Sequence, residues 1–438
     1  MAGADPIAAW HALLRESASP ASCDDLAARM RDRGLTFGGR LLCPFLRPFF
    51  LHREDERRVA RAAEALWRLG ERLAHEAVRD HTLLDALGLS DAEIDLVSID
   101  PGPGPASTAA RADAFLLPES LQFAEYNAES PAGPAYSQGL AALFDADPLM
   151  TSFKQQFDAR YYTPVGALLD ALMATYREWG GTARPPRVAI VDWREVPTYS
   201  EFELLRDAFT AAGVPTSIHD PRDLDFGSGA LTAGGDRIDF VYRRVLINDI
   251  LARRDECRAL VDAYRARAVC VANTFRCKIA HKKAFFAILT NPRHRRLFDP
   301  ADLDAVSAHV PWTRVIDESH AGLLVLDRER YVIKPNDEYG GSGVTLGWEA
   351  DERTWERALH KAQTGGVWIA QERINIRRET FPICTGEDIA ARDMLVDFAP
   401  YVFRGRVAGY LTRLSATGLA NVTSGGGQVP AFVVSPKP

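Results

Sequence analysis

The sequence predicts a mixed α/β protein in which a mostly parallel sheet is flanked by helices. Residues 185–228 have the pattern of a strand, a loop, a helix and a second strand, and residues 238–242 and 268–272 are further short apolar runs. Apolar runs that alternate with helical segments are typical of parallel sheets covered by helices. The 438 residues exceed one ordinary core, so two or three domains, or one composite enzyme, are expected.

The elements before this region divide at a Pro/Gly cluster. Residues 1–105 are predicted to be mostly helical, because apolar side chains recur every three or four residues within 53–80. The cluster at 101–105 interrupts this pattern. Residues 111–127 then indicate two short strands around a turn at 118–120, and helices follow up to 180. We therefore divide the chain into residues 1–105, 106–180, 186–275 and 276–438.

The last segment begins with a helix over 282–289 and is expected to continue as hairpins to residue 434. Two of its predicted strands, at 331–334 and 367–374, end in polar residues. The run 331–334 ends in Lys334, and a glycine-rich turn follows it at Gly340, Gly341, Ser342 and Gly343. Glycines let a backbone approach phosphate oxygens closely, and a lysine on the adjoining strand can reach them as a point charge. The alternative is an ordinary turn without a ligand.

The composition excludes some classes of protein. The formal net charge is -7, whereas proteins that neutralise nucleic-acid phosphates usually have a basic excess. No apolar run is long enough to span a membrane, and the N-terminus lacks a signal-peptide pattern. A cytoplasmic location is therefore expected. Six cysteines are scattered without a CxxC pair, which predicts reduced thiols.

The pattern over residues 111–127 predicts a metal site. Residues two apart on a strand share a face, so Arg111 lies with Asp113 and Glu125 lies with Asn127. If the two strands pair, two carboxylates, an amide oxygen and a guanidinium converge. Mg²⁺ prefers oxygen ligands of this kind and completes its shell with water and phosphate oxygens. The alternative is a surface hairpin with alternating polar residues.

These motifs resemble a known family. The RxD and ExN pair resembles the magnesium hairpin of D-alanine–D-alanine ligase and other ATP-grasp enzymes, where it follows the phosphate-binding lysines. Here it precedes them. The order therefore resembles the circularly permuted ATP-grasp family, which includes glutathionylspermidine synthetase. The resemblance covers roughly residues 35–435 and implies an ATP-grasp fold with a Rossmann-like pre-ATP-grasp domain at 186–275.

The resemblance also implies site residues. Magnesium is expected on Asp113, Glu125 and Asn127, and the transferred phosphoryl group on Arg413, with Arg111 beside it. The expected ATP-binding residues are Lys283, Lys334, Gly340, Gly341, Ser342, Gly343, Gln371, Glu372, Ile374 and Glu379, with Lys282 as the alternative to Lys283. Asn421, Ser130, Tyr199, Glu201 and Arg243 are candidates for the substrate cleft, together with Arg244. For the strand-end residues, solvated surface positions are an equal alternative.

The implied activity is an ATP- and Mg²⁺-dependent carboxylate–amine ligase that forms an amide through an acyl phosphate. Its partners would be a small-molecule or peptide carboxylate and an amine, without nucleic acid or membrane. The alternatives are a small-molecule kinase on the same scaffold and a non-catalytic nucleotide-binding module. The chain carries Lys282 where the synthetase often has Asn, and no fused amidase domain is expected, so the synthetase's own substrates are not carried over.

Overall fold

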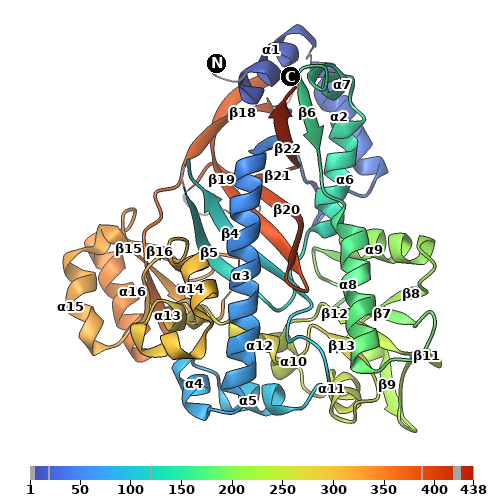
Figure 1. Cartoon of the computed structure of the whole chain (residues 1–438), viewed down its shortest axis with the longest axis vertical. Coiled ribbons are helices and arrows are strands. Elements are labelled where there is room, and N and C mark those ends of the chain that lie inside the picture. The colour runs from blue at the N-terminus through green and yellow to red at the C-terminus, as the bar shows by residue number, and fades with distance from the viewer. Residues whose placement is uncertain are drawn as a thin grey trace.

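A long helix and a mixed set of smaller elements form the N-terminal region. The computed structural model describes residues 5–17, 20–118, 120–338, 340–385, 388–417 and 426–437. Helix α3 (Arg53–Ala77) crosses one face of the central sheet in Figure 1, and Leu66, Leu69 and Leu73 are buried beneath it. The predicted helical character is confirmed. The other elements are α1 (Pro6–Ser17), α2 (Pro20–Asp32), α4 (His81–Ala86), α5 (Asp91–Ser98), β1 (Thr36–Phe37), β2 (Arg40–Leu41) and β3 (Phe49–His52).

The central sheet joins distant parts of the chain. Its order is β21-β20-β19-β4-β5, and β18 pairs with β19. The predicted hairpin forms β4 and β5, and Tyr401 of β19 lies opposite Arg111 of β4. The early hairpin therefore shares a sheet with the last strands of the chain. The bounds are β4 (Ala109–Leu116), β5 (Leu121–Asn127), β18 (Arg378–Thr385), β19 (Asp388–Phe403), β20 (Arg406–Ser415) and β21 (Gly427–Val429).

A four-stranded parallel sheet has the order β13-β12-β7-β8, which confirms the predicted parallel pairing. Assignment of this region as Rossmann-like stays a prediction. The strands are β7 (Val188–Val191), β8 (Thr216–His219), β12 (Phe240–Arg243) and β13 (Cys270–Ala272), with α9 (Tyr199–Ala211), α10 (Ile247–Ala252) and α11 (Arg258–Arg265). A small antiparallel sheet follows β8 and contains β9 (Leu224–Gly227), β10 (Ala230–Ala233) and β11 (Asp236–Ile238).

Three helices and a small sheet connect these two parts. They are α6 (Pro134–Asp145), α7 (Pro148–Phe153), α8 (Pro164–Trp179), and the sheet of β3, β6 (Phe157–Arg160) and β22 (Ala431–Pro436). Strand β22 is parallel to β3 and antiparallel to β6. Helix α1 and strand β22, the first and last elements described, both lie toward the top of Figure 1.

A separate antiparallel sheet, with the order β14-β17-β15-β16, lies at the left of Figure 1 and has its own apolar core around Trp355 and Ile333. The prediction of hairpins alone was wrong here, because the helices α15 and α16 lie between these strands and α14 precedes them. The elements are α12 (Cys277–His281), α13 (Ala284–Leu289), α14 (Pro300–Ser307), β14 (Thr313–Val315), α15 (Glu318–Leu326), β15 (Tyr331–Pro335), β16 (Thr345–Leu346), α16 (Glu352–Thr364) and β17 (Trp368–Glu372).

A disulfide corrects the prediction of reduced thiols. Cys23 on α2 is bonded to Cys384 at the end of β18, at a Cα–Cα distance of 5.8 Å. The partners are 361 residues apart, so their proximity follows from tertiary packing alone. Cys43, Cys257, Cys270 and Cys277 are free and buried. Disulfides are typical of oxidising compartments, and the cytoplasmic location stays a prediction.

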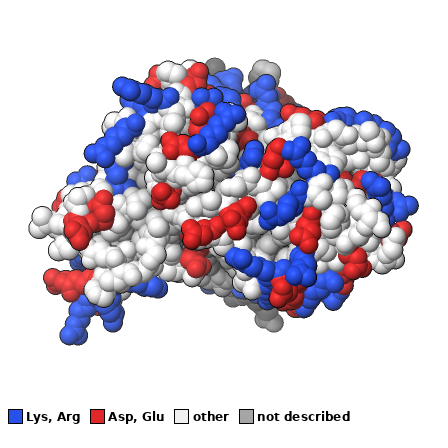
Figure 2. All heavy atoms as spheres, turned by 90° about the horizontal axis from the view of Figure 1, so that it is seen from below, with Lys and Arg blue, Asp and Glu red and all other residues white. Residues whose placement is uncertain are grey.

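Two surface properties concern possible partners. Basic and acidic side chains are interspersed over the face drawn in Figure 2. Within the described part of the chain, no helix has the length and apolar character needed to cross a bilayer.

Candidate active site

A cavity of about 740 Å³ lies where the sheets meet. Asp113 reaches it from the central sheet, and Lys334 and Gln371 reach it from β15 and β17. Asp192 and Arg244 border it from the ends of the parallel strands. Residues of the early hairpin and of the late lysine-bearing segment therefore line the same space.

The register of the hairpin arranges its four polar residues as two cross-strand pairs. Arg111 lies opposite Asn127, and Asp113 lies opposite Glu125, with an irregularity in the pairing directly after Asp113. All four border the cavity. Alternation along both strands turns these side chains to one face, because successive residues of a strand point to opposite faces.

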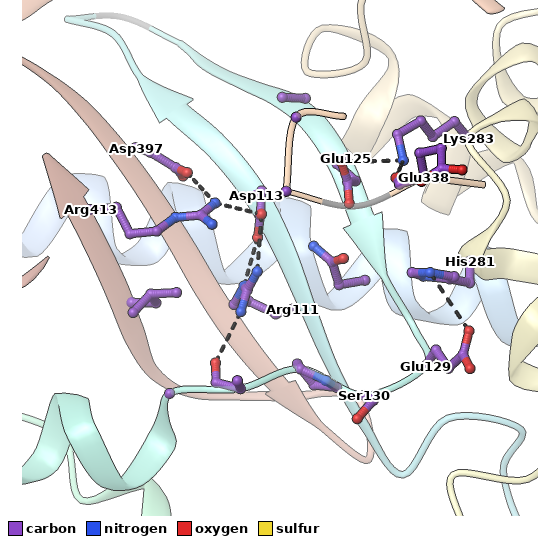
Figure 3. Close-up of a pocket in the computed structure, with 18 of the residues that line it drawn as sticks. Arg111, Asp113, Glu125, Glu129, Ser130, His281, Lys283, Glu338, Asp397 and Arg413 are labelled. Carbon is purple, nitrogen blue, oxygen red and sulfur yellow. Dashed lines mark hydrogen bonds and ion pairs between the residues drawn. The ribbon is translucent and has the colours of Figure 1, made fainter. Parts of the chain in front are cut away.

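Asp113 is held between two arginines (Figure 3). Arg111 donates to its carboxylate from Nε at 2.7 Å and from Nη2 at 3.1 Å, and Arg413 donates from Nη2 at 2.6 Å. Burial would raise the pKa of Asp113, but the charges of the two arginines outweigh it and hold this pKa below its usual value. Asp113 is therefore ionised.

A second carboxylate, Asp397, completes this cluster and was not identified from the sequence. It lies on β19 directly opposite Arg413 on β20, and Arg413 donates a hydrogen bond to it. Its other oxygen, Oδ1, is buried without a hydrogen-bond partner in the described structure. Burial raises the pKa of Asp397 to about 6; Arg413 opposes this rise, and the charge of Asp113 adds to it. Its signal in the sequence was a lone acid within an apolar run.

Two lysines face the cavity from the other side. The Nζ atom of Lys283 lies 2.5 Å from the carbonyl oxygen of Glu338 and 3.5 Å from Oε2 of Glu125. The Nζ atom of Lys334 donates to Oε1 of Gln371 at 2.7 Å and to the carbonyl of Ala124 at 3.1 Å. Burial lowers the pKa of Lys334 to about 8, although the charge of Glu125 opposes the change.

Lys282 faces away from this space. Its Nζ atom lies 2.7 Å from Oε1 of Glu93 and 2.7 Å from Oδ2 of Asp337. Lys283 lines the cavity and Lys282 does not. The geometry therefore favours Lys283 as the phosphate-binding residue.

The glycine-rich turn borders the cavity through part of its length. Gly340 and Gly341 line it, whereas Ser342 and Gly343 do not. Gly343 has a φ of 71°, and a Cβ atom there would lie 2.8 Å from Cγ of Pro335. Only glycine adopts this close, left-handed conformation without strain.

The strand predicted to read the nucleotide also borders the cavity. Gln371, Glu372 and Ile374 line it. Gln371 donates from Nε2 to the hydroxyl of Thr313 at 3.2 Å, while its Oε1 holds Lys334. Glu372 pairs with Arg330 at 3.2 Å. Gln371 is thus fixed from both ends before any ligand binds.

Glu379 lies elsewhere. It is on β18, opposite Met394, and is not among the residues that line the cavity. Its carboxylate pairs with the fully buried Arg47, whose Nη2 lies 2.9 Å from Oε2. An unpaired buried guanidinium is costly, so Glu379 compensates Arg47. Its assignment to the nucleotide does not agree with this position.

The candidates for the substrate cleft do not all border the cavity. Tyr199, Glu201 and Arg243 do not line the cavity, whereas Ser130 does. Glu201 is fully buried and accepts from the backbone N–H of Gly133 at 2.7 Å, so it holds the loop after the hairpin. Arg243 is fully buried in the interior. These positions correct the expectation of a cleft for Glu201 and Arg243. The remaining candidate, Asn421, lies outside the described residues.

A buried charged cluster on the cavity wall was also missed. Glu129 lies 3.3 Å from Nζ of Lys278, 3.3 Å from Nη1 of Arg243 and 3.7 Å from Nε2 of His281. Burial would raise the pKa of Glu129, but Lys278 and Arg243 lower it to about 2. Figure 3 shows His281 beside Glu129 at the cavity. Lys278 and His281 are neighbours on α12, but Glu129 and Arg243 are far from them in the sequence, so no local spacing indicated the cluster.

The donor set has the chemistry of a magnesium site that a substrate completes. Asp113, Glu125 and Asn127 offer carboxylate and amide oxygens to one cavity. In the described part of the chain, no group of three or more His, Cys, Asp or Glu side chains could hold a metal alone. Mg²⁺ is usually bound by one or two carboxylates together with water and phosphate oxygens. The residues therefore fit a metal that arrives with a phosphate.

Comparisons with known proteins concern the sequence and the fold of the chain. A putative glutamate–cysteine ligase 2-2 of Frankia casuarinae is 26% identical over 289 residues, which is 61% of this chain and 32% of that protein. The chain thus spans about a third of this curated relative's length. A glutathione synthetase-like effector of Globodera pallida, solved without ligand, has a TM-score of 0.62 at 12% identity, over 98% of each chain.

Another solved structure has a weaker likeness. A putative gamma-glutamylcysteine synthetase of Methylobacillus flagellatus has a TM-score of 0.42 at 12% identity, over 80% of this chain and 82% of that one. The model of the family described as circularly permuted ATP-grasp type 2 matches residues 124–422, more than half of the sequence. The chain belongs to the circularly permuted ATP-grasp type 2 family.

Proposed function

We propose that the protein is an ATP- and Mg²⁺-dependent ligase that joins a carboxylate to an amine. One observation carries this proposal: Lys283 and Lys334 line a single cavity together with the Asp113–Glu125 pair. The cations suit a triphosphate and the acids suit its metal. Family membership and the name of the Frankia relative support the same class of activity.

Each side of the cavity has a distinct role. Glu125 and Asn127, with Asp113, would hold Mg²⁺, which supplies neutralisation of phosphate charge when bound. Lys283 and Lys334 would bind phosphate oxygens in place of their present carbonyl and amide partners. Because Lys334 is already held by Gln371, little ordering of its side chain is required on binding.

Arg413 and Arg111 would act in phosphoryl transfer. A substrate carboxylate oxygen would form a bond to the γ-phosphorus as the bond to ADP breaks, giving an acyl phosphate. The amine nitrogen would then attack the acyl carbon, phosphate would leave with its bonding electrons, and the nitrogen would lose a proton. The two guanidiniums, fixed by Asp113, would stabilise the charge on the transferred group.

The glycine-rich turn is the natural cover for these steps, because an acyl phosphate is hydrolysed if water enters. Its base is fixed: Asn336 donates from Nδ2 to the carbonyl of Leu87 at 2.8 Å, and its Oδ1 accepts from the N–H of Ala284 at 2.8 Å. Movement of the turn would therefore begin after Asn336.

An ADP-release screen tests the proposal. The protein is supplied with ATP, Mg²⁺ and pairs of carboxylic acids and amines, and ADP, free phosphate and amide product are measured. Equal amounts of all three are expected with the correct pair. Glu125→Gln should abolish release, and Glu356→Gln, at an exposed site on α16, should not. A stable phosphorylated product without free phosphate would identify a kinase and overturn the proposal.

A further inference from the structure

The parallel sheet has a point at which its connections diverge. The chain runs from β7 to β8 on one side, and then returns to β12 and β13 on the other side of β7. Strands β7 and β12 are neighbours, so the loops after their carboxyl ends lead in opposite directions and leave a crevice. In open α/β sheets, ligands bind in such a crevice. Asp192 directly follows β7 and Arg244 directly follows β12.

The carboxylate of Asp192 is largely buried, yet it has few hydrogen-bond or charged partners. Only 9% of the residue is exposed, and this exposure is to the cavity that it lines. Oδ1 accepts a hydrogen bond from the N–H of Trp193 at 2.9 Å. Within the described ranges, no cation pairs with Asp192. Burial raises its pKa to about 6; Arg244 opposes the rise and Asp249 adds to it. An uncompensated buried carboxylate is costly, and a cation from the cavity would remove that cost.

Two further charges border the same end of the cavity. Asp249, in the first turn of α10, lines it and has no ion pair within the part of the chain that is described. Arg244 is 4% exposed and donates from Nη1 to the carbonyl of Pro131 at 2.6 Å, while its Nε is buried without a partner. The end of the cavity thus contains two unpaired acids and one incompletely bonded guanidinium.

This end of the cavity is linked through one loop to Arg111, which is proposed to act in phosphoryl transfer. Arg244 holds the carbonyl of Pro131, and Arg111 donates from Nη1 to the next carbonyl, that of Ala132, at 2.9 Å. The hydroxyl of Ser130 donates to the carbonyl of Arg244 at 2.8 Å, which fixes the loop from its other end. Residues 130–132 therefore connect the end of the cavity at Arg244 with Arg111.

We infer that Asp192, Asp249 and Arg244 form a subsite for the zwitterionic head group of an amino-acid substrate. The ammonium lies at Asp192 and Asp249, and the carboxylate lies at Arg244. The inference rests on the proposed ligase function and specifies its substrate class. A simple carboxylic acid leaves both aspartates without a counter-charge. A polyamine brings a cation to Arg244. Only a head group with both charges matches both sides of the subsite.

Substrate analogues test the inference on the unaltered protein. The standard amino acids are assayed for ADP release with MgATP and an amine mixture, and those that stimulate release are compared with their N-acetyl and decarboxylated forms. Each modification removes one charged hydrogen-bonding partner, so KM should rise at least about tenfold in both forms. N-acetyl forms that are as effective as the free amino acids would overturn the inference.

Variants test the residues. Asp192→Asn keeps an acceptor for the N–H of Trp193 and removes the charge. Asp192→Asn and Asp249→Asn should each raise KM for the amino acid about tenfold and leave KM for ATP unchanged. Asp255→Asn, on an exposed position after α10, is the matched control. Unchanged KM values for the amino acid in both cavity variants would contradict the subsite.

The outcomes separate this inference from the proposed function. Stimulation by acids without an ammonium group, but not by amino acids, overturns the subsite and leaves the ligase standing. Absence of ADP release with every acid–amine pair overturns the ligase. In that case calorimetry of each free amino acid with the wild-type protein and with Asp192→Asn still decides the subsite, because binding that is weakened by the variant supports it and absence of binding contradicts it.

Discussion

The charge of Lys334 should make nucleotide affinity depend on pH. Burial lowers the pKa of this lysine to about 8, so its ammonium is lost at a lower pH than that of an exposed lysine. From this value, about nine-tenths of the molecules carry the charge at pH 7 and about one-tenth at pH 9. A triphosphate binds the ammonium and not the amine. Affinity for a non-hydrolysable ATP analogue with Mg²⁺ should therefore fall about tenfold between these two pH values.

The lowered pKa of Lys334 also determines whether nucleotide binding takes up or releases a proton. Bound phosphate favours the charged lysine and raises its pKa, so binding above about pH 8 takes up a proton. Calorimetry in two buffers with different ionisation enthalpies measures this uptake. Lys334→Arg stays charged and should remove the pH dependence, whereas Lys437→Arg, at an exposed lysine, should retain it. Equal affinities at both pH values for the wild-type protein, without proton uptake, would refute the reasoning.

Three further predictions concern the hairpin, the lid and the disulfide. Glu125→Gln should abolish ADP formation without changing thermal stability. Asp113→Asn should abolish it too, and should also lower the free energy of unfolding by about 3 kcal/mol, because two arginines lose a buried partner. Equal unfolding curves for Asp113→Asn and the wild-type protein would count against this. Gly343→Ala should slow ADP formation about tenfold through strain in the turn, so a normal kcat would contradict its role. Cys23→Ser should lower Tm and remove its sensitivity to reductant, since a bond across 361 residues stabilises by up to about 5 kcal/mol; a Tm that still responds to reductant would argue against the bond.

The hairpin could be predicted because its information is local. Arg111 and Asp113, like Glu125 and Asn127, are two residues apart, and the period of a strand places such pairs on one face. Lys334 was recognisable for the same reason, since it ends an apolar run before a glycine-rich turn. These features need only the periodicity of a strand and the conformational freedom of glycine.

The remaining features depend on neighbours that are distant in the sequence. The role of Asp397 becomes evident only when β19 and β20 place it opposite Arg413. Glu379 was assigned by its spacing from Glu372, but β18 turns it toward Arg47. The pairing of Cys23 with Cys384 likewise follows from packing across the whole chain. A single sequence does not specify such contacts.

The central claim is that the early hairpin and the late lysine-bearing segment enclose one magnesium triphosphate. A crystal structure with Mg²⁺ and a non-hydrolysable ATP analogue measures this directly. We expect phosphate oxygens within hydrogen-bond distance of Nζ of Lys283 and Lys334, and the metal on Asp113, Glu125 and Asn127. A nucleotide bound elsewhere, with Lys283 still on the carbonyl of Glu338 and Lys334 still on Gln371, would contradict the account.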